Sequence, residues 1–241
     1  MPKKLRILSV TFDAQIEPWE LPYLRAAIAH QAGWEHEMFH NHNSETGGFH
    51  YRLPLIQYKH HRGRPMLLCL NEGIDEAYHF FSHPNWNVLI NGRNVPIGIS
   101  RLDVREYHLT TPQERPRLYH IRHWIALNED NYATYTRLPG MVERFFLLEK
   151  ILQNQIVAFL QEVDCAPDWG VEVKLLDKKD ERWVSYKGVR VLAFSLEFSS
   201  NVFLPDYIGL GKGCSSGWGV VRPIPAKKPS FTFGNPASEV E

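Results

Sequence analysis

Two histidines separated by one residue, His40 and His42, are the side chains of this sequence best suited to acid–base chemistry. A free imidazole has a pKa of about 6.5, so histidine can take up or release a proton near neutral pH. In a locally extended backbone, residues i and i+2 point to the same side, so both rings could address one reacting group. All histidines of the chain lie between His30 and His123. No catalytic histidine can therefore come from residues 124–241.

A metal site is the alternative use of these histidines. His40, His42 and His50 could supply nitrogen ligands, but no carboxylate or cysteine stands at a spacing that supports such a site. The letters HNH at 40–42 are not the HNH nuclease motif, whose named residues are far apart in sequence and hold a metal. We therefore expect neither a metal nor another cofactor.

A glycine-rich stretch, GLGKGCSSGWG at residues 209–219, is the second unusual feature. Its glycines are Gly209, Gly211, Gly213, Gly217 and Gly219. The spacing matches neither the P-loop nor the dinucleotide-binding pattern, and consists of two Gly-apolar-Gly units five residues apart. Such a stretch is either a flexible surface turn or a loop whose backbone N–H groups approach an anion, with Lys212 and Ser215 adding charge and a donor.

Positive charge is concentrated in two segments without any acid, although Lys+Arg and Asp+Glu number 27 each and the pI is about 7.2. Residues 46–71 contain Arg52, Lys59, Arg62 and Arg64. Residues 207–238 contain Lys212, Arg222, Lys227 and Lys228. The two segments could form one positive face for a polyanion, or be a solvated hairpin and a solvated tail.

Size and composition are those of an ordinary globular protein that forms one large domain or two small ones. The chain has 241 residues, of which 44% are hydrophobic and 22% charged. Three scattered cysteines without a CxxC pair fit a reducing compartment. Because no apolar run approaches the roughly 18 residues of a membrane span, we expect a cytoplasmic protein without a membrane partner.

The order of predicted elements indicates a ferredoxin-like unit in the first half. Hydrophobic periodicity and turn residues predict strands at 5–12, 49–59, 66–70 and 87–99, with a turn at 61–65, and helices at 21–32 and 72–81. A strand–helix–strand–strand–helix–strand order is typical of this unit, in which two helices cover one face of an antiparallel sheet.

The second half repeats this order incompletely. Strands are predicted at 118–127, 171–176, 183–186, 189–198 and 218–221, a tight turn at Lys187-Gly188, and a helix at 139–164. No second helix is evident, and the proline-rich tail from Pro223 is expected to be irregular. The fold class is therefore α+β, with two ferredoxin-like (RRM-like) units in tandem, the second irregular. We divide the chain into domains at 1–99 and 100–241.

Two stretches at opposite ends of the chain resemble one protein family. The glycine-rich stretch near the C-terminus is similar to the signature loop of CRISPR repeat-processing endoribonucleases of the repeat-associated mysterious protein superfamily. FHNHNSETGGFHYRLPLIQYKHHRGRP at 39–65, followed by GIDEAYHFF, resembles the subgroup with an N-terminal His-x-His. The missing second helix is a departure from the full pattern of the family.

The resemblance implies a metal-independent endoribonuclease that cuts CRISPR repeat RNA and often keeps the product. Carried over residue by residue, it places catalysis at His40 and His42, with Tyr23 and Lys59 in support as hydroxyl donor and charge stabiliser. RNA binding is assigned to the glycine-rich stretch with Lys212 and Ser215, and to Arg52, Arg62 and Arg64. Precursor CRISPR RNA is the expected partner, and other effector subunits and a second copy of the chain are further candidates.

Two other functions are open at this point. A non-catalytic CRISPR RNA-binding subunit of an effector complex would keep the glycine-rich stretch and the basic face without using the histidines. A phosphate-ester enzyme of unrelated family would depend on a metal.

Overall fold

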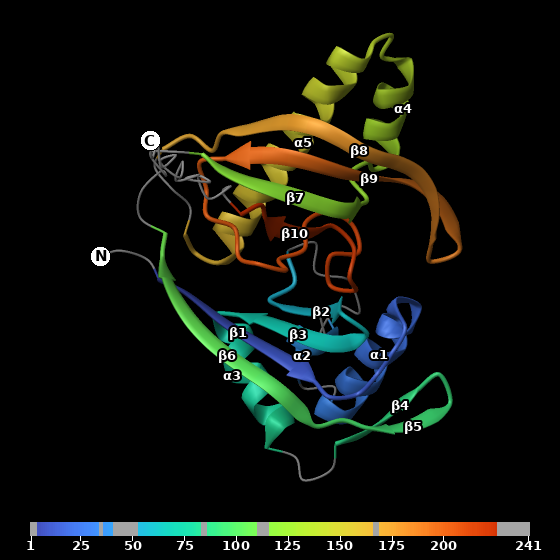
Figure 1. Ribbon diagram of the computed structural model, residues 1–241, viewed down its shortest axis with the longest axis vertical. Helices are drawn as coiled ribbons and strands as arrows, with labels where there is room; N and C mark the ends of the chain where they lie inside the picture. The colour runs from blue at the N-terminus through green and yellow to red at the C-terminus, as the bar shows by residue number, and fades with distance from the viewer. Residues whose placement is uncertain are drawn as a thin grey trace, which may run out of the picture.

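The computed structural model describes residues 4–33, 36–40, 53–82, 86–109, 116–165 and 169–225, without the side chain of His40. Two four-stranded antiparallel sheets, one in each half of the chain, organise the molecule (Figure 1). The tandem ferredoxin-like arrangement predicted from the sequence is confirmed.

The first sheet has the strand order β2-β3-β1-β6, which is the order of a ferredoxin-like unit. Its strands are β1 (Lys4–Phe12), β2 (Ile56–His61), β3 (Arg64–Leu70) and β6 (Ile99–His108). Its helices are α1 (Leu21–Ala32), preceded by the short 3-10 helix η1 (Pro18–Glu20), α2 (Glu37–His40) and α3 (Glu72–Phe81). The turn between β2 and β3 is tighter than expected, since Arg62 and Gly63 have φ of 50° and 80° and the strands reach to either side of them.

Alternation along β1 separates two hydrophobic cores. Leu8, Val10 and Phe12 face α1 and α3, whereas Leu5 and Ile7 join the core of the second half. Successive side chains of a strand point to opposite faces of the sheet, so alternate residues of β1 enter different cores when both faces are covered. The first sheet is thus covered by helices on one side and by the second half on the other (Figure 1).

One predicted strand of the first half was wrong. Residues 87–99 form no single strand; β4 (Asn87–Ile90) and β5 (Arg93–Pro96) make a separate hairpin, and the fourth strand of the sheet is β6. Asn91 and Gly92 have φ of 48° and 76°, the left-handed conformation of a two-residue hairpin turn. The division of the chain at residue 99 stays a prediction, and the pairing of β6 with β1 favours a division nearer residue 109.

The second sheet has the order β10-β7-β9-β8, the same topology as the first. Its strands are β7 (Arg117–Trp124), β8 (Val173–Tyr186), β9 (Val189–Ser200) and β10 (Val220–Pro223), with α4 (Glu129–Arg137) and α5 (Met141–Glu162) between β7 and β8. The two strands expected at 171–176 and 183–186 are one long strand with two register shifts, and α4 was missed. Residues 201–219 contain no helix, as the sequence predicted, and hold the glycine-rich stretch.

Candidate functional site

The glycine-rich stretch, called here the glycine segment (residues 209–219), lies against β2 of the first half. Three hydrogen bonds connect consecutive β2 residues to it: Gln57 Oε1 accepts from Gly209 N at 2.8 Å, Tyr58 N donates to Ser215 O at 2.7 Å, and Lys59 Nζ donates to Cys214 O at 2.6 Å. Two segments some 150 residues apart in sequence therefore form one unit.

Lys59 lies beneath the glycine segment. Its side chain is 0% exposed, and burial lowers the pKa of its amine to about 7. The ammonium thus has no surface from which to contact RNA directly in this structure. Its expected role as a charge stabiliser stays a prediction, and the geometry favours a role in holding the segment.

Close packing against protein atoms explains why glycine recurs in the segment. A Cβ at any of the five glycines would lie less than 3.0 Å from a protein atom. At Gly219, where φ is +59°, it would lie 1.9 Å from Leu210 O, and at Gly217, where φ is +86°, 2.7 Å from Leu21 Cδ1. The glycines therefore allow the segment to pack closely against the rest of the protein. Their approach to RNA phosphates stays a prediction.

The segment is an ordered loop in this structure, and its backbone is hydrogen-bonded inside the protein. Donors and acceptors pair as Leu210 N to Gly219 O at 2.9 Å, Lys212 N to Ile125 O at 3.1 Å, Ser216 N to Gly213 O at 2.9 Å and Gly219 N to His123 O at 3.2 Å. These four N–H groups are directed at carbonyls and are not available to an anion, whereas an anion-binding nest made by other N–H groups of the segment stays a prediction.

Lys212 carries the charge of the segment on its outer side. Its side chain is exposed, and Nζ lies 5.8 Å from the centre of the Tyr186 ring. Ser215, expected to donate to RNA, is buried, whereas the neighbouring Ser216 is half-buried with its hydroxyl 3.4 Å from that of Ser215. Lys212 and Ser216 are thus the polar side chains nearest the surface here; Ser216 was missed.

The start of α1 adjoins the glycine segment, because Leu21 lies under Gly217. Tyr23 on the same helix is 46% exposed and makes an edge-to-face contact with Trp19, with ring centroids 6.3 Å apart. Its hydroxyl is therefore on an element that contacts the segment.

The short helix α2, which ends at His40, packs against α1 and buries Phe39. The side chain of His40 and the whole of His42, His50 and Arg52 lie outside the described residues. The structure therefore brings the backbone of His40 to the helix that carries Tyr23.

A second feature is a cleft of about 360 Å³ between the first sheet and the chain after β9. Arg62 lines it, as do Arg222 of the predicted basic segment 207–238 and two arginines that sequence reasoning did not consider, Arg101 and Arg105. Arg64, by contrast, is exposed at the start of β3. A polar strand face could have been recognised in the sequence, because charged or polar residues occupy every second position at Arg101, Asp103, Arg105 and Tyr107. The sequence analysis assigned these residues to no element.

The cleft, called here the arginine cleft, is electropositive although part of its charge is paired. Asp103 pairs with Arg105 at 2.7 Å, and Asp206 accepts from Arg222 at 2.5 Å. Four arginines and two aspartates leave an excess of two positive charges. Burial and the nearby Arg222 lower the pKa of His61, which favours its neutral form.

Two further properties concern only the part of the chain that the structure describes. No three His, Cys, Asp or Glu side chains gather there as a metal site, and the candidate set His40, His42 and His50 falls outside it. Within those same ranges, no helix has both the length and the apolar character that crossing a membrane requires.

Comparison with known proteins places both halves in one family. Residues 3–108 match the family model described as Cas6b N-terminal domain, and residues 111–224 match the Cas6b C-terminal domain. An uncharacterized protein of Methanocaldococcus jannaschii (MJ0978) is 39% identical over 100 residues, which are 41% of this chain and 65% of that protein. This chain therefore spans less than two thirds of that relative's length.

Solved structures share the whole fold. A crystal structure of Cas6b has a TM-score of 0.78 at 23% identity, covering 92% of this chain and 100% of its own. A second, described as the CRISPR RNA processing endoribonuclease Cas6b, has a TM-score of 0.66 at 19% identity, covering 92% and 100%. Csf5, a type IV Cas6 crRNA endonuclease, has 0.60 at 12%, covering 92% and 99%. At these identities the likeness concerns the fold.

Proposed function

Since this chain belongs to the Cas6b family, we propose that it is a metal-independent endoribonuclease that cleaves CRISPR repeat RNA to mature CRISPR RNAs. The chemistry is an attack by the RNA's own 2′-oxygen on the adjacent phosphorus. The 2′-hydroxyl proton goes to a base, the P–O5′ bond breaks, and an acid gives a proton to the departing 5′-oxygen. The products are a 2′,3′-cyclic phosphate and a 5′-hydroxyl.

The residues assigned to proton transfer are His40 and His42, with His40 as the principal group. Each such transfer contributes roughly 10²–10⁴-fold to the rate. The hydroxyl of Tyr23 serves as a donor to the charged transition state from the surface of α1. Lys59 supports this site from below by holding the glycine segment.

Binding of the RNA backbone is assigned to the positive side chains around this surface. Lys212 presents its ammonium beside the glycine segment, and the arginine cleft supplies an excess of positive charge between the two halves. Arg52, Arg62 and Arg64 add charge in the 46–71 segment. Contacts of this kind to phosphates carry affinity rather than sequence preference.

One observation carries this proposal: the docking of the glycine segment onto β2 and the start of α1. The Lys59–Cys214 bond joins the two stretches that resemble the endoribonuclease family, and the contact of Gly217 with Leu21 adds the start of α1. They also put the segment beside the helix that holds Tyr23 and packs against α2. This arrangement supports the proposal that binding and proton-transfer groups lie on neighbouring elements.

The test is incubation of repeat RNA with the full chain in EDTA, with and without a single 2′-deoxy sugar upstream of the cut. Cleavage should persist in EDTA and be abolished by the 2′-deoxy sugar. His40→Ala should lower the saturated single-turnover rate about 10²-fold or more with little change in affinity. The matched control is His30→Ala, an exposed histidine near the far end of α1, which should cleave normally.

Other outcomes identify the other functions. Tight RNA binding without cleavage under any condition would support the non-catalytic subunit of an effector complex. Cleavage only after a divalent metal is restored would overturn the metal-independent mechanism. Association with effector subunits or with a second copy of the chain stays a prediction.

A further inference from the structure

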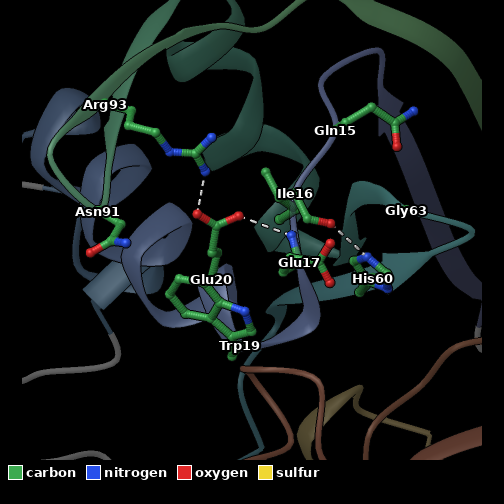
Figure 2. Close-up of a pocket in the computed structure, with 9 residues that line it drawn as sticks. All are labelled: Gln15, Ile16, Glu17, Trp19, Glu20, His60, Gly63, Asn91 and Arg93. Carbon is green, nitrogen blue, oxygen red and sulfur yellow. Dashed lines mark hydrogen bonds and ion pairs between the residues drawn. The ribbon is translucent and has the colours of Figure 1, made fainter.

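A cavity of about 490 Å³ lies beside the start of α1, outside the residues assigned to cleavage. It is formed by residues 15–20, the β2–β3 turn and the β4–β5 hairpin. Figure 2 shows Asn91 and Arg93 of the hairpin on one side of this cavity, and Gln15 and His60 on the other. Its volume is within the usual range of small-ligand sites, about 300–1,000 Å³.

An exposed aromatic ring borders the cavity. Trp19 is 58% exposed, an unusual position for an indole, and its ring makes an edge-to-face contact with Tyr23. A solvent-facing indole is a stacking platform for a flat π-system. Stacking of nucleic-acid bases on such rings is worth about 1–3 kcal/mol per base in single-strand binding proteins, and is tolerant of sequence.

The polar lining is preorganised. Arg93 donates to the carboxylate of Glu20, which is 2% exposed and also accepts from Glu17 N at 2.9 Å. His60 Nε2 donates to Ile16 O at 2.9 Å. The hairpin and the loop before α1 are therefore fixed relative to each other, and the guanidinium is held at the cavity wall.

The charge balance of the cavity selects against a phosphate. Glu17 and Glu20 face a single arginine, whereas the arginine cleft has an excess of positive charge. Two neutral amides, Gln15 and Asn91, are exposed at the cavity and can both donate and accept hydrogen bonds. An aromatic platform with amides and no net positive charge suits the edge and face of a neutral base.

The cavity lies next to the proposed cleavage surface. Leu21, two residues after Trp19, contacts the glycine segment at Gly217. His60, in the lining, follows Lys59, which is bonded to Cys214 of that segment. Elements that line the cavity therefore adjoin the glycine segment, to which RNA binding is assigned.

We propose that this cavity receives one unpaired nucleobase of the repeat RNA, stacked on Trp19 and read by Gln15 and Asn91. The inference rests on the proposed function, because it requires that the chain bind repeat RNA. It makes the cavity a specificity-determining site, separate from the groups that transfer protons and from those that bind phosphates.

The test is a double-mutant cycle between protein and RNA. Repeat RNA made uncleavable by a 2′-deoxy sugar carries a single abasic site, moved one position at a time across the cleavage region. The wild-type chain should lose about tenfold in affinity at one position. Trp19→Ala should show a similar loss with intact RNA and no further loss with the abasic RNA at that position, whereas Trp19→Phe should retain the base effect.

Trp183→Ala is the matched control, because Trp183 on β8 is 49% exposed and does not line the cavity. Its effect and that of base removal should add. Gln15→Ala and Asn91→Gly should reduce discrimination among the four bases at the same position; glycine keeps the positive φ of Asn91. Additive effects of Trp19→Ala and base removal at every position would overturn the proposed base binding in the cavity and would leave the cleavage proposal standing. Absence of RNA binding by the wild type would overturn both proposals.

Discussion

Replacing Lys59 with methionine tests whether the buried amine of this lysine, whose pKa is lowered to about 7, holds the glycine segment. Methionine is similar in length and apolar, so it fills the space without the amine. The change removes the hydrogen bond to Cys214 O and leaves that carbonyl without this partner, at a cost of about 1–3 kcal/mol. It also removes the cost of burying a protonated amine.

The burial cost depends on pH, and its sign is fixed by the lowered pKa. Between pH 7 and 10.5 the unfolded state binds the lysine proton and the folded state releases it, so the stability of the wild type rises with pH across this window. Because the pKa falls from 10.5 to about 7, burying the amine lowers the free energy of unfolding of the wild type by about 4 kcal/mol at pH 7 and by about 2 kcal/mol at pH 9. Lys59→Met has no amine at this position, so its stability carries no such pH-dependent cost.

The assay is urea unfolding of the wild type and Lys59→Met at pH 7 and pH 9. Between these values the wild type should gain about 2 kcal/mol relative to the variant. Both proteins carry Cys214→Ala, because burial raises the pKa of this thiol and the adjacent Lys59 lowers it, so its titration would otherwise differ between them. Lys150→Met, which changes an exposed lysine on α5, should leave the pH dependence unchanged. Parallel pH profiles for the wild type and Lys59→Met would refute the reasoning.

The same variant separates positioning from charge stabilisation. If Lys59 holds the segment, Lys59→Met should weaken repeat RNA binding more than it lowers the saturated single-turnover rate. A lower saturated rate with unchanged affinity would instead make Lys59 a charge stabiliser of the transition state.

The remaining predictions concern charge, backbone and a hydroxyl. Lys212→Ala should weaken RNA binding about uniformly across sequences and lower the slope of log affinity against log salt by about 0.7, one phosphate of a single strand, whereas Lys150→Ala should do neither. Gly219→Ala should destabilise the fold by about 3 kcal/mol or more in urea unfolding, because the new Cβ meets Leu210 O. Gly188→Ala, with positive φ and open space around it, should cost only about 1–2 kcal/mol, and equal costs would contradict the packing argument. Tyr23→Phe should lower the saturated cleavage rate about 10²-fold at unchanged affinity, and a wild-type rate would remove Tyr23 from the site.

Local patterns were sufficient for most of the fold. The apolar spacing of α1, α3 and α5 and the Lys187-Gly188 turn predicted those elements. The turn at Asn91-Gly92 is an equally strong local hairpin signal that was overlooked, so the strand on either side was read as one. Without that hairpin, β6 had no place in the predicted sheet, and its arginines went unassigned.

The site was less predictable, because its contacts join segments far apart in sequence. The reason for each glycine is an atom elsewhere in the fold, such as Leu21 under Gly217, and no local pattern specifies that contact. Lys59 looks like an ordinary basic residue in the sequence, and only its bond to Cys214 shows that it is buried beneath the segment. The cavity beside Trp19 likewise depends on the placement of the β4–β5 hairpin.

The most direct test of the proposed function is the chemical identity of the ends made by the full chain on repeat RNA in EDTA. Mass spectrometry of the upstream fragment should find a 2′,3′-cyclic phosphate, one water lighter than a linear monophosphate, and the downstream fragment should begin with a 5′-hydroxyl. An upstream fragment ending in a 3′-hydroxyl, with a 5′-phosphate on the downstream fragment, would contradict attack by the 2′-oxygen.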